Sequence, residues 1–233
     1  MAEIDDNISN IRNRIKAAAA RVGRDPAEIT LIAVSKTVPV ERIAPALNAG
    51  IIDLGENRVQ EAETKVGSLA APGLRWHLIG PLQSNKARRA VELFEVIHSL
   101  DSIKIAERLN RIAGELSKKM PVLIQVDLGK ETTKSGIDES ELESMVKAFA
   151  GFDHLQLEGL MTLPPYFENI EDVRPYFRRL RQLKEELNAS GFATQQMKEL
   201  SMGMSHDFEV AVEEGATMVR VGTAIFGTRS MPI

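Results

Sequence analysis

The sequence contains no cysteine and few aromatic residues, with one tryptophan and two tyrosines among its 233 positions. The absence of cysteine excludes disulfides, thiolate nucleophiles and thiolate metal sites, and it agrees with a reducing cytosol. Acidic and basic residues nearly balance, and the formal net charge of -4 gives no support for a nucleic-acid partner or an acidic membrane surface.

Long apolar runs are also missing from the sequence. No uncharged stretch approaches the roughly 20 residues that a membrane-spanning helix needs. The N-terminus carries charged side chains from Glu3 to Lys16, so it has no apolar signal-peptide core. We therefore expect a cytoplasmic protein with no membrane partner.

Short apolar runs and amphipathic segments alternate eight times along the chain. The apolar runs predict strands at residues 29–34, 51–54, 76–79, 95–98, 122–126, 155–160, 199–202 and 218–221. Eight alternations in roughly 200 residues favour one (β/α)8 TIM barrel, an α/β fold, spanning residues 1–233 as a single domain. An open flavodoxin-like sheet is the alternative, but it normally has fewer strands.

An additional helix is predicted before the first strand. Ile4, Ile8, Ile11 and Ile15 recur at spacings of three and four, and Gly23 is the predicted cap at the end of the helix. Because a barrel has no position for a helix before its first strand, we expect this helix to plug the base of the barrel.

The first predicted strand ends at Ser35-Lys36, and barrel sites lie at the carboxyl ends of the strands. A lysine that forms a Schiff base needs a partly desolvated position, where its pKa falls and the neutral amine can attack a carbonyl. Lys36 meets this condition, although a lysine at a strand end is more often a solvated charge. Its position favours a covalent site for an aldehyde.

Two later strand ends predict a phosphate site. The loops after the seventh and eighth strands read SMGMS at 201–205 and GTAIFG at 222–227. Ser201, Gly203, Gly222 and Thr223 are small residues that allow backbone N–H groups to approach an anion, in loops where barrel enzymes often bind phosphate. The alternative is that both loops are only tight turns.

A lysine and a phosphate site at one mouth together point to a phosphorylated aldehyde. Pyridoxal phosphate sites pair the ring nitrogen with an acidic residue or an arginine, and Arg220 lies beside the second loop. A lysine aldolase that acts on a sugar phosphate would use the same lysine and loops, so it stays open as an alternative.

At these residues the sequence resembles the pyridoxal phosphate homeostasis protein family. The matching stretches run from the first predicted strand to the last: AVSKT at 33–37, LGEN at 54–57, WHLIGPLQSNK at 76–86, KSG at 134–136, GLM at 159–161, LSMGMS at 200–205 and VRVGTAIFG at 219–227. Two departures are Leu54, where an aromatic residue is common, and His206-Asp207, where two aspartates are common.

The resemblance implies a fold type III pyridoxal phosphate barrel, like the N-terminal domain of alanine racemase. It implies that Lys36 forms the Schiff base, with Arg220 beside the cofactor and Asn57 and Met161 along its ring. It places around the phosphate Ser201, Gly203, Met204, Gly222 and Thr223. The family has no established catalysis and acts in vitamin B6 and amino-acid homeostasis. The expected ligand is pyridoxal 5′-phosphate, and the candidate recipients of the cofactor are pyridoxal-phosphate-dependent apoenzymes.

A carrier is favoured over an amino-acid racemase, the alternative function. Racemisation needs an acid or base on each face of the substrate carbon, and Lys36 serves only one face. We interpret Tyr166 and Tyr176 as helix-packing residues and His77 as a hydrogen-bonded core residue. The sequence ends shortly after Gly227, so we expect no second domain over the mouth. The sequence shows no exposed apolar stripe of the kind that forms an oligomer interface, so we expect a monomer. We also expect no metal site.

A polar loop at residues 129–136 follows the fifth predicted strand on the mouth side. We hypothesise that Lys134 in this loop attracts the phosphate or receives the aldehyde in transit. Borohydride trapping and peptide mapping test this, and the absence of a modified Lys134 peptide in a Lys36→Ala variant would contradict it.

Overall fold

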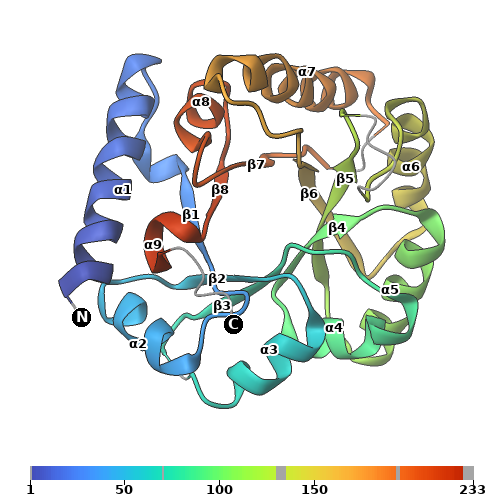
Figure 1. The fold of residues 1–233 in the computed structure, drawn as a ribbon. Helices are drawn as coiled ribbons and strands as arrows, with labels where there is room; N and C mark the ends of the chain where they lie inside the picture. Colours follow the sequence, from blue (N-terminus) through green and yellow to red (C-terminus); the bar gives the residue numbers. More distant parts are fainter. Residues whose placement is uncertain (1, 70, 130–134, 193–194, 228–233) are drawn as a thin grey trace.

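Eight parallel strands close into a barrel in the computed structural model, which describes residues 2–69, 71–129, 135–192 and 195–227. Each strand pairs with the next one along the chain, and β8 pairs back with β1 (Figure 1). The strands are β1 Thr30–Val34, β2 Asp53–Glu56, β3 Arg75–Leu78, β4 Val96–Leu100, β5 Met120–Val126, β6 Leu155–Thr162, β7 Glu199–Met204 and β8 Met218–Val221. The predicted TIM barrel is confirmed.

Helices surround the strands, as the crossover between parallel neighbours requires (Figure 1). They are α1 Ala2–Arg21, α2 Val40–Asn48, α3 Val59–Val66, α4 Ala87–Leu93, α5 Ile103–Glu115, α6 Leu142–Ala148, α7 Arg174–Ser190, α8 Phe208–Glu213 and α9 Thr223–Phe226. Short 3-10 turns precede or follow several of them: η1 Pro26–Glu28, η2 Ser84–Lys86, η3 Glu139–Glu141, η4 Phe149–Gly151 and η5 Ile170–Val173.

The first helix lies outside the barrel, so the expectation that it plugs the base is wrong. It contacts α8, α9 and α2, and therefore covers the outside of the seam between β8 and β1 (Figure 1). The helix that follows β8, α9, has only four residues and leaves room on this face. The apolar stripe of α1 fills it, because Ile4, Ile8, Ile11 and Ile15 are all buried.

Several strands end later than the apolar runs predicted. The second predicted strand, 51–54, is observed as Asp53–Glu56, and the seventh continues past Met202 to Met204. Gly55 and Glu56 pair with His77 and Leu78 of β3. Apolar character reports burial in an apolar layer, whereas strand pairing depends on backbone hydrogen bonds. Buried polar residues at the strand ends were therefore missed as strand residues.

A backbone irregularity in β7 shapes the mouth of the barrel. Ser201 pairs with Met218, whereas Met204 pairs with Arg220, so β7 has one extra residue over this interval. Gly203 lies in the irregularity with φ +90°, and a Cβ atom there would lie 2.5 Å from the Ala211 Cβ. The position therefore requires glycine.

None of the helices in the described part of the chain combines the length and apolar character needed to cross a membrane.

We expect Ile8→Ala to lower the free energy of unfolding by about 2–5 kcal/mol. The substitution shortens a fully buried side chain on the inner face of α1 and leaves a cavity between this helix and the barrel. Urea denaturation measures the change. Ile52→Ala is the matched control: Ile52 is 46% exposed, and we expect a change within about 0.5 kcal/mol. Equal effects of the two substitutions would contradict the packing of α1 on the seam.

Candidate functional site

Lys36 follows β1 in a tight turn at the barrel mouth. The Val38 N–H donates to the Ser35 carbonyl at 2.9 Å, and Thr37 has φ +62°. This left-handed conformation is uncommon for a β-branched residue and costs on the order of 1–3 kcal/mol. The Thr37 N–H donates to Glu61 Oε2 of α3 at 3.0 Å, which contributes to holding the turn. Lys36 itself is half-buried.

A buried ion pair lies behind this turn. Glu56 Oε1 accepts from Lys65 Nζ at 2.6 Å and from Ser35 Oγ at 2.7 Å, and Lys65 Nζ also donates to the Ser35 carbonyl at 2.7 Å. The other oxygen, Glu56 Oε2, is buried without a hydrogen-bond partner. Burial raises the pKa of Glu56, and the hydrogen bonds from Lys65 and Ser35 oppose the rise. The pair ties α3 and β2 to the residue before Lys36.

The loops after β7 and β8 converge on one hydroxyl group. The N–H groups of Gly222 and Ala224 donate to Ser205 Oγ at 3.2 and 3.3 Å. Two backbone N–H groups that point at one oxygen form the arrangement that binds an anion in many phosphate sites. The predicted residues Ser201 and Gly203 belong to the same stretch of β7, beneath Ser205.

The seam between β1 and β8 brings these loops to the lysine turn. Ala33 pairs with Val221, and a Cβ atom on Gly222 would lie 3.3 Å from both the Val34 Cβ and the Val34 carbonyl oxygen. Val34 is two residues before Lys36. The structure therefore brings together the loops that carry the lysine and the converging N–H groups, which lie near opposite ends of the sequence.

Arg220 is a buried cation beneath the mouth, with an exposure of 3%. Its Nη1 donates to Ser201 Oγ at 2.5 Å, and its Nη2 donates to the Thr162 carbonyl at 2.9 Å. Burial lowers the pKa of Arg220 to about 10, and the negative charge of Asp207 opposes this change. Arg220 is therefore protonated at neutral pH and acts only as a donor.

The remaining predicted site residues also lie at the carboxyl ends of strands. Asn57 follows β2, and its backbone packs so tightly on Gly80 that a Cβ atom there would lie 2.3 Å from the Asn57 carbonyl oxygen. Met161 pairs with Ser201 in the sheet but is fully buried. Met204 and Thr223 are exposed at the rim.

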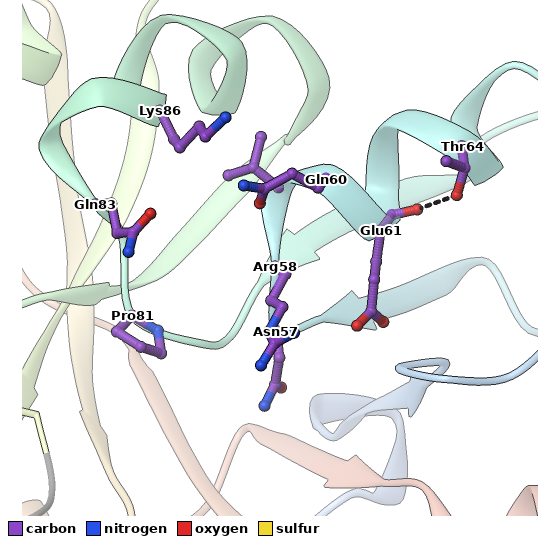
Figure 2. A pocket seen from close by; sticks show the side chains of 9 residues that line it. Asn57, Arg58, Gln60, Glu61, Thr64, Pro81, Gln83 and Lys86 are labelled. Carbon is purple, nitrogen blue, oxygen red and sulfur yellow. Dashed lines mark hydrogen bonds between the residues drawn. The ribbon is translucent and has the colours of Figure 1, made fainter. Parts of the chain in front are cut away.

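A cleft of about 790 Å³ opens beside the lysine turn rather than over the buried arginine. Figure 2 shows its two sides: Pro81, Gln83 and Lys86 follow β3, while Asn57 and Arg58 follow β2 and Gln60, Glu61 and Thr64 lie on α3. Val59 also lines the cleft. Asn57 is the one predicted site residue that lines it. Glu61 also caps the Thr37 N–H, so the cleft borders the turn that carries Lys36.

His77 is a hydrogen-bonded core residue, as predicted. It is fully buried, and its two ring nitrogens contact His98 at 2.9 Å and Asp53 at 2.8 Å. Burial by itself would raise the pKa of Asp53, but hydrogen bonds from His77 and Arg75 outweigh it and lower the pKa below its usual value. Asp53 is therefore ionised at neutral pH.

The tyrosine interpretation holds for one residue of the two. Tyr176 lies on α7 and packs against the Phe167 ring at 5.5 Å. Tyr166 is not a helix-packing residue, because it lies in the loop after β6 and is 74% exposed. Its ring stacks on that of His206, with 5.0 Å between the ring centroids. Lys134 lies outside the described residues. Within the ranges that the structure describes, no three His, Cys, Asp or Glu side chains gather as a metal ion would require.

Sequence reasoning missed several residues that shape the site. Ser205 belongs to the predicted mouth loop at 201–205 but is not among the predicted phosphate-binding residues, although it follows Gly203 by two residues. Asp53 lies in an apolar predicted strand, and a charged residue in such a run was an available signal. No pattern in the sequence indicated that Lys65 pairs with Glu56, because that contact depends on how α3 packs on the barrel.

Residues 7–230 match the family model described as alanine racemase, N-terminal domain. A curated relative, the pyridoxal phosphate homeostasis protein of Aquifex aeolicus (strain VF5), is 44% identical over 224 residues, which cover 96% of this chain and 97% of that protein. The similarity therefore extends over nearly the whole of both chains.

Solved structures are similar to this chain as well. PipY of Synechococcus elongatus PCC7942, described with PLP bound, is 40% identical with a TM-score of 0.85, and the match covers 96% of this chain and 100% of that chain. An alanine racemase of Clostridium difficile 630 is 16% identical with a TM-score of 0.72. The match covers 99% of this chain and 57% of that racemase, and it shows the shared fold alone.

We expect Lys65→Met to lower the free energy of unfolding by about 3–5 kcal/mol, because it leaves the buried Glu56 carboxylate unpaired. The loss should be smaller at about pH 5 than at about pH 8. Burial raises the pKa of Glu56 and Lys65 opposes the rise, so removing Lys65 raises the folded pKa further and the variant loses more stability than the wild type as the pH rises. Chemical denaturation at both pH values measures this.

Lys147→Met is the control for this prediction, because Lys147 pairs with Glu143 at the surface and both side chains are at least half exposed. We expect a change of no more than about 0.5 kcal/mol. The double variant Glu56→Gln with Lys65→Met should recover part of the lost stability. A Lys65→Met protein as stable as the Lys147→Met protein would contradict the role of the buried pair.

Proposed function

Because this chain belongs to the pyridoxal phosphate homeostasis proteins, a family with the alanine racemase N-terminal domain, we propose that it binds pyridoxal 5′-phosphate for vitamin B6 and amino-acid homeostasis. The observation that carries the proposal is the closeness of the Lys36 turn to the converging N–H groups of Gly222 and Ala224. An amine and an anion site across one barrel seam fit a phosphorylated aldehyde.

The residues present fit the phosphate group. The N–H groups of Gly222 and Ala224 already point at one oxygen, Ser205 Oγ, which stands where an acceptor belongs. Gly203 and Gly222 lack a Cβ where the backbone passes close to Ala211 and Val34, so the loops can approach an anion through their main chain. Ser201, Met204 and Thr223 complete this side of the site in our proposal.

The residues present also fit the ring. Arg220 carries a positive charge and can only donate hydrogen bonds, so it would pair with an unprotonated ring nitrogen. Asn57 would lie along the ring, with the buried Met161 beneath it. Lys36 would hold the aldehyde carbon covalently through Nζ, next to Val34 and the Gly222 loop.

We propose that the protein carries the cofactor and does not turn over amino acids. Bound pyridoxal phosphate supplies an electron sink for substrate carbanions, and this sink is weaker when the ring nitrogen is unprotonated. A donor at Arg220 favours that weaker state. Tyr176 packs on Phe167 and Tyr166 stacks on His206 at the rim, so each tyrosine ring is held by another aromatic side chain. Action as a cytoplasmic monomer that supplies pyridoxal-phosphate-dependent apoenzymes belongs to the same proposal.

An amino-acid racemase is the second candidate, and one observation favours it. Tyr166 is an exposed titratable group at the mouth side, in the loop that follows β6. A tyrosine there could act as a second acid or base if the loop moved toward Lys36.

We expect the purified protein to develop a visible absorption band with pyridoxal phosphate, and Lys36→Ala to lose it, because Lys36 is the residue that bonds to the aldehyde. Lys86→Ala is the matched control, since Lys86 lines the neighbouring cleft. Borohydride reduction and peptide mapping should place the modification on Lys36. A band retained in Lys36→Ala would contradict the assignment, and no band in the wild type would favour a sugar-phosphate aldolase.

We expect no conversion of L-alanine to D-alanine beyond the rate given by free pyridoxal phosphate, because racemisation needs an acid or base on each face of the substrate carbon and Lys36 serves only one face. Chiral chromatography of alanine incubated with the loaded protein measures this. Racemisation that is abolished by Tyr166→Phe would overturn the carrier proposal in favour of the racemase.

A further inference from the structure

A continuous chain of hydrogen bonds crosses the interior of the barrel. Asp53 Oδ1 lies 2.8 Å from His77 Nε2, and His77 Nδ1 lies 2.9 Å from His98 Nε2. His98 Nδ1 lies 2.8 Å from Ser201 Oγ, which accepts from Arg220 Nη1 at 2.5 Å. The five residues come from β2, β3, β4, β7 and β8, and none is more than 4% exposed.

This chain of hydrogen bonds runs from the end of the barrel where β2 and β3 begin to the mouth. Asp53 begins β2, and it pairs with Arg75, which begins β3 and has a side chain that is 47% exposed. Arg220 lies on β8 beneath the mouth. The bond from His98 to Ser201 connects β4 with β7, which are not neighbours in the sheet, so these side chains meet across the interior.

The two ends of the chain allow only one direction of hydrogen bonding when both imidazoles are neutral. The ionised Asp53 only accepts, so His77 donates through Nε2 and accepts at Nδ1. His98 must then donate through Nε2 and accept at Nδ1, and burial lowers its pKa well below the usual value, which keeps it neutral. Ser201 donates its hydrogen to His98, and its oxygen accepts from Arg220.

This direction decides what the site presents at the mouth. The Ser201 hydroxyl hydrogen is used by His98, so the place of Ser201 in the proposed phosphate site depends on its main chain and not on its hydroxyl group. The Arg220 guanidinium is held at two points, Ser201 Oγ and the Thr162 carbonyl oxygen, and this fixes the plane of its remaining donors. A planar fork recognises an acceptor well only when its plane is fixed.

We propose that His77 and His98 are positioning residues that hold the Arg220 guanidinium in one orientation at the mouth. They act through Ser201, whose oxygen they turn toward the guanidinium and whose hydrogen they draw away from the mouth. The chain ends on the Asp53–Arg75 ion pair at the opposite end of the barrel, which therefore helps to set the geometry of the mouth. This inference rests on the proposed function, in which the cofactor ring lies against Arg220.

The first test measures histidine tautomers in the cofactor-free protein by long-range ¹H–¹⁵N NMR at neutral pH. The sequence has four histidines, so each can be assigned by a single substitution, and His154 and His206 are references outside the chain. We expect the ring proton of both His77 and His98 to be on Nε2. A proton on Nδ1 of either residue would overturn the proposal, because the Ser201 hydrogen would then be free to face the mouth.

The second test measures the Arg220 guanidinium in the same cofactor-free protein, with its signals assigned by Arg220→Lys. We expect two separate Nη signals in the wild type, because rotation is restrained, and averaged signals in His77→Phe, which breaks the chain. His77→Gln should restore the separation, since an amide can accept from His98 and donate to Asp53. His154→Phe is the matched control. Separate signals that persist in a folded His77→Phe protein would overturn the proposal.

The third test measures the affinity for pyridoxal phosphate from its absorption band. We expect about tenfold weaker binding by His77→Phe, as the loss of one net hydrogen bond implies, and near wild-type binding by His77→Gln and His154→Phe. Unchanged binding by His77→Phe would overturn the positioning role. A wild type without any band would contradict the proposed function, while the two measurements on the cofactor-free protein would still decide whether the chain orients Arg220. If His77→Phe does not fold, Ser201→Ala breaks the same chain at its other end.

Discussion

The pairing of β8 with β1 is the constraint on which the site depends. Four residues of each strand are in register, from Thr30 with Met218 to Ala33 with Val221. This pairing closes the barrel, leaves no open sheet edge, and sets the last loops of the chain against its first strand. The Lys36 turn and the Gly222 loop become neighbours only through this seam. The helix α1 protects it from outside with a stripe of buried isoleucines.

The interior of this barrel is unusual in its polarity. Such barrels are ordinarily filled by layers of valine, isoleucine and leucine, but here Asp53, His77, His98, Ser201 and Arg220 run through it. Buried polar groups are costly unless each finds a partner, and a fully satisfied network favours a single arrangement. Glu56 and Lys65 form a second buried polar pair behind the lysine turn, in which Glu56 Oε1 is hydrogen-bonded and Glu56 Oε2 has no partner. Stability and the geometry of the mouth thus depend on the same buried contacts, rather than on apolar packing alone.

The fold alone does not decide between the proposed carrier and the alternative enzyme. Barrel geometry places Lys36, Arg220 and the loops after β7 and β8 toward one mouth, and none of these alone decides whether a bound amino acid is turned over. That outcome depends on a second acid or base and on the electronic state of the ring. In the proposed complex a donor held at Arg220 would act on the ring, and the placement of Tyr166 at the rim, stacked on His206, bears on the acid or base.

The sequence by itself determined the barrel, the order of its strands and the residues at the mouth, because apolar periodicity and strand–helix alternation are local properties. It predicted that Lys36, Arg220 and the two glycine loops lie toward the same mouth, since barrel topology brings the carboxyl ends of the strands together. It misplaced α1 and ended β2 and β7 early, because packing partners and buried polar pairs are not local. Only the tertiary structure decided that Glu56 meets Lys65 and that His98 reaches Ser201. Those contacts join strands and helices far apart in sequence, and their burial exists only after the barrel has closed.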